Sequence, residues 1–147
     1  MHIHPYLTFE NAKEAMEYYR DTFGAKISFR HPLSQDTAEN LGMSVDHLED
    51  TTLYGEITIN GQIIACADAV MGTTNASSLV SIMLDFADDT NAAKELFQRV
   101  SASDDQKVTV PFAAHETGGM YGRIVDKYGV NWVITSEVAS DGQPAED

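Results

Sequence analysis

The sequence is poor in cysteine and in positive charge, and it has no long apolar run. Cys66 is the only cysteine, so no intrachain disulfide can form, and its apolar neighbours predict a buried, unreactive thiol. The first five residues lack a basic region followed by an apolar segment, which predicts no signal peptide. No apolar stretch approaches the length of a membrane span. We therefore expect a cytoplasmic protein that does not bind membranes.

Basic residues are outnumbered by acidic ones. Lys and Arg total 9 against 23 Asp and Glu in 147 residues, and the formal net charge is −14. A nucleic-acid binder needs a basic face to displace counterions from phosphates, and an anionic membrane attracts the same kind of surface. The charge therefore argues against both partners and predicts a solvated acidic surface. The length suits one domain, and a hydrophobic fraction of 43% is enough for a core.

The hydrophobic pattern gives one order of elements twice: a strand, an amphipathic helix and three strands. Asn60-Gly61 marks a two-residue hairpin in the first half, and Gly24 marks the end of its helix. In the first half, the predicted strands cover residues 2–9, 26–29, 53–59 and 63–67, with a helix over 11–24 and an irregular excursion over 32–50. In the second half, the strands cover residues 79–86, 107–110, 121–125 and 130–134, with a helix around 93–100.

This repeat predicts an α+β fold of two βαβββ modules that form an open, curved mixed sheet around a cleft. One helix can cover only one face of each four-stranded sheet, so the other face is left concave and open. We expect a single domain over residues 1–136, with modules at about 1–70 and 78–136. Residues 137–147 should form a flexible acidic tail.

The concave face should carry the polar side of each alternating strand, and such a cleft is the default ligand site. Glu56 is the best acid/base candidate, because it lies on an inward strand face. His115 lies in a loop that precedes Gly118-Gly119 and could contribute a contact from a lid. The predicted ligand-binding residues are His4, Tyr6, Tyr54, Met83, Asn131, Val133 and His115.

Several short motifs, in this order along the chain, carry a family resemblance. They are His4-Pro5-Tyr6-Leu7-Thr8-Phe9, Phe23-Gly24-Ala25, Val108-Thr109-Val110-Pro111, Tyr121-Gly122 and Tyr128-Gly129-Val130-Asn131-Trp132. Together they resemble PhnB-like proteins of the vicinal-oxygen-chelate superfamily, which includes glyoxalases, bleomycin-resistance proteins and extradiol dioxygenases. The resemblance implies the glyoxalase/bleomycin-resistance fold and a homodimer.

Metal-dependent members of this superfamily hold one divalent ion on the concave face, and the resemblance places its ligands at four positions. Those positions hold His4, Tyr54, Ser81 or Met83, and Val133. Glu56 lies two residues after Tyr54 and faces the same way. With only His4 and Glu56 as strong ligands, we expect no tight metal site, although Zn, Ni, Mn or Fe could use these two residues.

Three functions stay open, and whether the protein is an enzyme stays open with them. The favoured one is the binding of a small molecule in the cleft without a metal. The second is a divalent-metal-dependent lyase, isomerase or dioxygenase that uses His4 and Glu56. The third is a non-catalytic homodimer that acts through protein interaction. PhnB-like sequences are sometimes described as demethylubiquinone methyltransferases, but no glycine motif here would hold a cofactor for methyl transfer.

Overall fold

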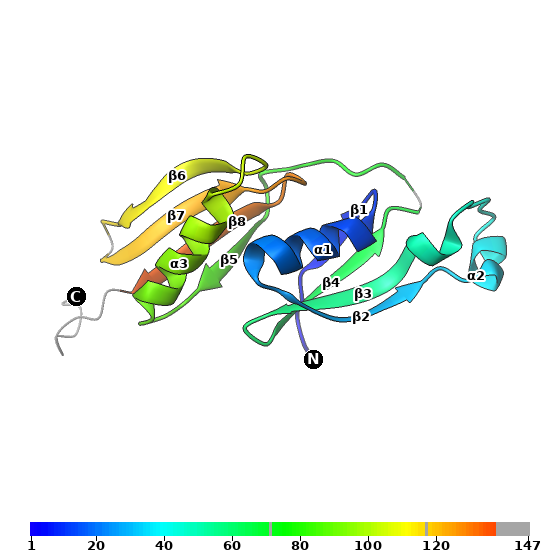
Figure 1. Cartoon of the computed structure of the whole chain (residues 1–147), viewed down its shortest axis with the longest axis horizontal. Coiled ribbons are helices and arrows are strands. Elements are labelled where there is room, and N and C mark those ends of the chain that lie inside the picture. The colour runs from blue at the N-terminus through cyan, green and yellow to red at the C-terminus, as the bar shows by residue number, and fades with distance from the viewer. Residues whose placement is uncertain (71, 117, 138–147) are drawn as a thin grey trace. The chain divides into compact units, whose positions relative to one another are not determined.

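The computed structural model describes residues 1–70, 72–116 and 118–137. The chain divides into two compact units, residues 1–75 and 76–147, which we call module 1 and module 2 and describe separately. Module 1 contains β1 (Tyr6–Phe9), α1 (Ala12–Phe23), β2 (Lys26–Pro32), α2 (Gln35–Asn40), the 3-10 helix η1 (Leu48–Asp50), β3 (Thr52–Ile59) and β4 (Gln62–Asp68). Module 2 contains β5 (Ser81–Asp85), α3 (Thr90–Ser101), β6 (Lys107–Ala114), β7 (Gly119–Val125) and β8 (Asn131–Glu137) (Figure 1).

Each module is a four-stranded mixed sheet with the same topology. The strand order is β1-β4-β3-β2 in module 1 and β5-β8-β7-β6 in module 2. The first strand of each module pairs in parallel with the last, and all other pairs are antiparallel. This confirms the predicted α+β class and the two βαβββ modules. No helix in the described part of the chain is long and apolar enough to cross a lipid bilayer.

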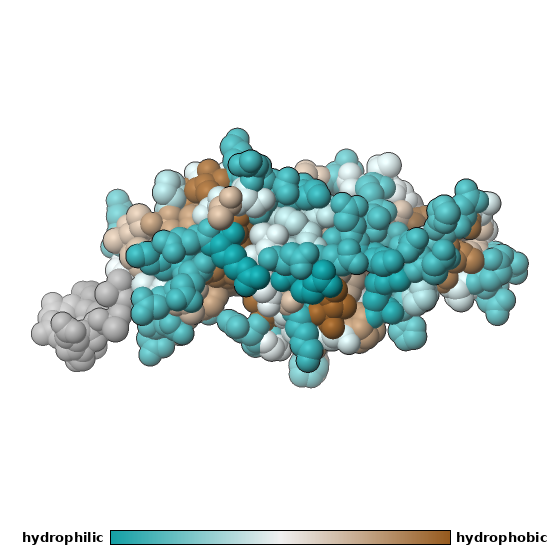
Figure 2. All heavy atoms as spheres, viewed as in Figure 1, coloured by the Kyte–Doolittle hydropathy of each residue, from teal (hydrophilic) through white to brown (hydrophobic). Residues whose placement is uncertain are grey.

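Helix α1 covers one face of the module 1 sheet (Figure 1). The side chain of Asn11 accepts a hydrogen bond from the Glu14 amide and caps the first turn, and Gly24 ends the helix at φ 71°. Its apolar stripe packs against the sheet, and the buried members are Ala12, Ala15, Met16, Tyr19 and Phe23. On the face drawn in Figure 2, hydrophilic residues predominate, as the net charge leads one to expect.

Helix α3 covers one face of the module 2 sheet in the same way, with Asp89 as its N-cap. Trp132 is fully buried, and its indole Nε1 donates to the Asp126 carboxylate at 2.7 Å. Asp126 also accepts the backbone N–H groups of Tyr128 and Val130 at 2.8 and 3.0 Å. One carboxylate therefore fixes both the β7–β8 turn and the largest core side chain of this module.

The predicted hairpin between β3 and β4 is confirmed. Asn60 and Gly61 both have positive φ, at 48° and 77°, which is the conformation that a two-residue turn between twisted strands requires. The predicted excursion over residues 32–50 begins at the last residue of β2 and contains α2 and η1.

Three sequence predictions need correction. Residues 2–5 are not in a strand, because Pro5 has no N–H to give to a ladder, and Ile3 is 86% exposed. Alternation in the predicted strand over residues 53–59 places Leu53 on the same face as buried Ile57, yet Leu53 is 41% exposed. Glu137 was assigned to the tail but is the last residue of β8, where its N–H donates to the Ala87 carbonyl at 2.6 Å. Residues 138–147 lie outside the described residues.

Candidate functional site

The face of the module 1 sheet that lies opposite α1 carries the predicted polar residues. Gly55 and Ile57 face the helix, since a Cβ on Gly55 would lie 2.8 Å from Met16 Cε and Ile57 is fully buried. The intervening side chains, Tyr54 and Glu56, therefore point to the open face. Tyr6 and Glu56 pair with the same residue of β4, so the structure brings these predicted site residues together.

Aromatic rings cross this open face from β1 to β2 and form what we call the aromatic row. Its members are Tyr6, Tyr54, Phe29 and His31. Successive ring centroids are 6.3, 5.8 and 6.0 Å apart. Tyr6 is 57% exposed and Phe29 is 41% exposed. Two large aromatic side chains on one sheet face are thus partly exposed to solvent, and neighbouring exposed apolar side chains can mark an interaction site.

A polar pair lies inside the aromatic row. The Tyr54 hydroxyl donates to Oε2 of Glu56 at 3.3 Å, and both side chains are half-buried. Burial raises the pKa of the Tyr54 hydroxyl, and the neighbouring Glu56 charge raises it further. The pair can therefore present a neutral hydroxyl and a carboxylate to polar groups at the edge of a flat ligand.

A hollow of about 570 Å³ adjoins Tyr6. It is lined by Tyr6 and Thr8 of β1, by residues 68–70 and by residues 72–75. The lining segment is tied down, because Oε1 of Glu10 accepts the Thr74 N–H at 3.1 Å and the Thr74 hydroxyl at 3.2 Å. Asp68 accepts the Ala12 N–H at 2.8 Å and so joins the end of β4 to the start of α1. The volume suits a small organic molecule.

His4, unlike Glu56, does not lie in a strand. It precedes β1, is exposed, and stacks on His2 with a ring separation of 5.9 Å. In the described part of the chain, no third His, Cys, Asp or Glu joins these two residues in a group of possible metal ligands. The residues present therefore do not fit a closed metal site that uses His4 and Glu56.

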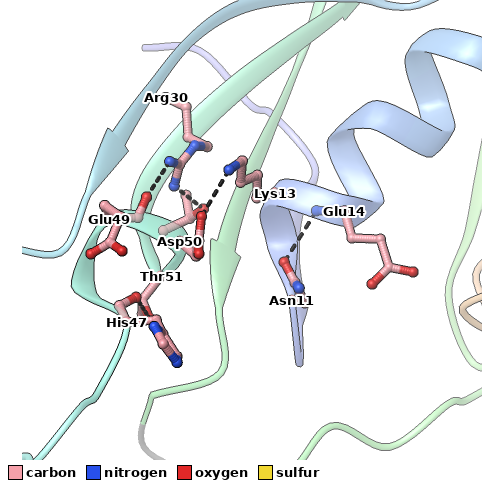
Figure 3. A network of polar contacts seen from close by, with 9 residues as sticks. Asn11, Lys13, Glu14, Arg30, His47, Glu49, Asp50 and Thr51 are labelled. Atoms are coloured by element: carbon pink, nitrogen blue, oxygen red, sulfur yellow. Dashed lines mark hydrogen bonds and ion pairs between the residues drawn. The ribbon is translucent and has the colours of Figure 1, made fainter.

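The one such group of three that the described residues contain lies elsewhere, at His47, Glu49 and Asp50 (Figure 3). All three are exposed, and Asp50 is held by the Lys13 ammonium at 2.8 Å. That hydrogen bond lowers the pKa of the Asp50 carboxyl. Arg30 donates to the Glu49 carbonyl at 2.5 Å. These contacts join η1 to α1 and β2, so we assign this cluster a structural role.

The other predicted site residues lie in module 2. Met83 and Val133 are paired across β5 and β8, with Met83 62% exposed and Val133 only 7% exposed. The Asn131 amide donates to the Ser77 carbonyl at 3.1 Å. The His115 ring lies 5.2 Å from that of Tyr121. These four residues, Met83, Val133, Asn131 and His115, do not belong to the aromatic row. Thr117, beside the predicted lid, lies outside the described residues.

Sequence analysis missed Phe29 and His31. A register shift between Ile27 and Phe29 is the reason. Ile27 pairs with helix-facing Ile57, whereas Phe29, two residues later, pairs with Glu56 on the open face. Simple alternation would have placed Phe29 toward the helix, so only the bulge brings it into the row.

The element order and the two sheets define the class of protein: this is the glyoxalase/bleomycin-resistance fold. The PhnB protein from Bacillus cereus superposes with a TM-score of 0.70 at 22% identity, covering 92% of this chain and 99% of that one. A glyoxalase/bleomycin resistance protein/dioxygenase from Nocardioides gives a TM-score of 0.60 at 14% identity, covering 100% of this chain and 90% of the other. At these identities the likeness concerns the fold.

Sequence comparison then gives the family. A family model described as 3-demethylubiquinone-9 3-methyltransferase matches residues 1–135. Protein YjdN of Escherichia coli (strain K12) is 30% identical over 141 residues, which cover 91% of this chain and 94% of YjdN. The chain therefore belongs to this PhnB-like family, and the resemblance seen in the sequence is confirmed.

Proposed function

We propose that the chain binds a small, flat organic molecule on the open face of module 1, stacked on the aromatic row. The observation that carries this proposal is the exposure of Tyr6 and Phe29 beside the hollow that Tyr6 lines. Offset or edge contacts between aromatic groups contribute about 0.5–1.5 kcal/mol each beyond the area that they bury. The Tyr54 hydroxyl and the Glu56 carboxylate supply the polar contacts that would orient such a ligand.

We propose further that this binding needs no divalent metal. His4 and Glu56 are two separate donors, and a catalytic metal in proteins is commonly held by three side chains. A metal-dependent lyase, isomerase or dioxygenase is the alternative, and it would need both residues on one ion. We do not propose methyl transfer, because the strand-to-helix connections at residues 10–11 and 86–89 contain no glycine to cradle a nucleotide-like cofactor.

A screen of flat heteroaromatic compounds by ligand-observed NMR tests the proposal. We expect hits whose affinity falls at least about tenfold in Tyr54→Ala and in Phe29→Ala, because each variant removes a stacking surface. Leu41→Ala is the matched control: Leu41 is 42% exposed, like Phe29 at 41%, but lies outside the row. This control should bind every hit as the unmodified protein does.

The same samples decide between the alternatives. Elemental analysis with added Zn, Ni, Mn and Fe should find no stoichiometric metal, and chelators should leave binding unchanged. A metal that is lost in both His4→Ala and Glu56→Ala would instead support the metal-dependent enzyme. If no compound binds, or if hits survive Tyr54→Ala and Phe29→Ala together, the aromatic row is not a ligand site and the interaction role gains support.

A further inference from the structure

Arg123 occupies the centre of β7 on the open face of the module 2 sheet. Its neighbours along the strand define this orientation. A Cβ on Gly122 would lie 2.5 Å from the Phe97 ring of α3, and Ile124 is fully buried, so both face the helix. Arg123 therefore points to the other side, where it pairs with Val133 of β8 and is half-buried.

The guanidinium has a neutral partner. Its Nη2 donates to Oγ of Ser81 at 2.8 Å, and no carboxylate of the described residues lies within ion-pair distance. The acidic residues at the ends of these strands do not contact Arg123. Asp85 accepts the Ala87 N–H at 2.9 Å, and Glu137 is exposed at the end of β8.

This lack of a carboxylate partner is unexpected in a chain with 23 acidic and 9 basic residues. A half-buried charge loses part of its hydration and needs compensating partners. Guanidinium offers five N–H donors, and the single bond to Ser81 leaves most of them for another acceptor. A carboxylate matches the planar fork of these donors in shape and in charge.

Apolar and aromatic side chains lie near Arg123 on this face. Met83, 62% exposed, lies across β8 on the same face, next to Val133. Tyr121 precedes Arg123 by two residues and so shares this face, and its ring lies 5.2 Å from that of His115. A ligand with one charged end and an apolar body would therefore cover both the cation and its neighbours.

We propose that Arg123, supported by Ser81, is the binding residue of a site for a small organic carboxylate with an apolar or aromatic body. One guanidinium matches one negative charge, and a net charge of −14 disfavours ligands of higher negative charge. The class of ligand is therefore a monoanion rather than a phosphate ester with two charges. The site lies wholly in module 2, so its test does not depend on whether the aromatic row in module 1 binds a ligand.

Titration with benzoate, phenylacetate and hexanoate, followed by NMR, tests the site in the full chain. Arg123→Met keeps the length of the side chain and removes its donors, and we expect at least a tenfold loss of affinity for the carboxylates that bind. Lys94→Met is the control, because it removes one positive charge from the exposed side of α3 and should leave binding unchanged. Neutral benzamide should bind far more weakly than benzoate, and added NaCl should weaken benzoate binding.

Four results would overturn the proposal. They are no binding of any of the three carboxylates, equal binding by Arg123→Met, equal binding of benzamide and benzoate, and tighter binding of the dianion phenyl phosphate. If carboxylates fail to bind and Arg123→Met changes the molecular mass in solution, the partner of Arg123 is a carboxylate of a second chain. The fluorescence of buried Trp132 checks that each variant is folded. Arg123→Lys keeps the positive charge, so it should retain part of the affinity for the carboxylate.

Discussion

At the scale of single residues, burial decides the chemistry of Cys66. The residue lies in β4 opposite Gly55, its thiol is fully buried, and burial raises its pKa to about 12. Because the thiolate is the reactive form, the predicted unreactive cysteine follows from its position alone. The sequence could show this in advance, since the apolar residues around Cys66 mark a strand that is buried on both sides.

We predict a pH dependence that is specific to this thiol. An unfolded thiol ionises near pH 8.5. The folded pKa is higher, so the thiol's contribution to stability is complete below that value and is lost as the pH rises toward about 12. Relative to Cys66→Ala, the unmodified protein should lose about 2 kcal/mol of unfolding free energy between pH 8 and pH 10. Urea unfolding at both pH values measures this difference, and a constant difference would contradict it.

At the scale of elements, sequence patterns located nearly every strand and helix but not every face. Tyr54 and Glu56 were placed correctly because β3 alternates without interruption. Phe29 was not, because a bulge in β2 reverses its direction, and a bulge depends on pairing with β3 rather than on local sequence. Arg123 was overlooked for another reason: its significance lies in having a hydroxyl partner, Ser81, and no carboxylate partner among the described residues. Such partners become known only when the strands are assembled.

The close approach of α3 to β7 gives a second prediction. A Cβ at Gly122 would lie 2.5 Å from Phe97 Cε2 and 3.1 Å from the Phe112 backbone. Gly122→Ala should therefore destabilise the protein by about 1–3 kcal/mol, because the Phe97 ring, which stacks on Phe112, must shift to admit the methyl group. Gly72→Ala is the control, since nothing lies within 4 Å of its added methyl group. Chemical denaturation compares the unfolding free energies of the two variants. Equal values would contradict the prediction, because they would show that the Phe97 ring moves aside without loss of stability.

At the scale of the whole molecule, the repeated topology leaves one face of each sheet without a helix. In module 2, Leu79 and Val80, which directly precede β5, are 90% and 71% exposed. We propose that two chains associate and cover such apolar surface. Light scattering should give about twice the chain mass of 16.1 kDa. A double substitution of Leu79 and Val80 to Ser should shift the mass toward that of one chain, and an unchanged mass would place the contact elsewhere.

The parallel pairing of the first and last strands of each module also sets the order in which strands can pair during synthesis. Tyr6 pairs with Ala65, and Ser81 pairs with Asn131, so the strand that leaves the ribosome first in each module has no neighbour until the last one emerges. The β3–β4 and β7–β8 hairpins, which join neighbouring segments, can form before that. During synthesis, β1, which carries Tyr6, therefore stays unpaired until β4 is made. The face proposed to bind a ligand is completed only when module 1 is fully translated.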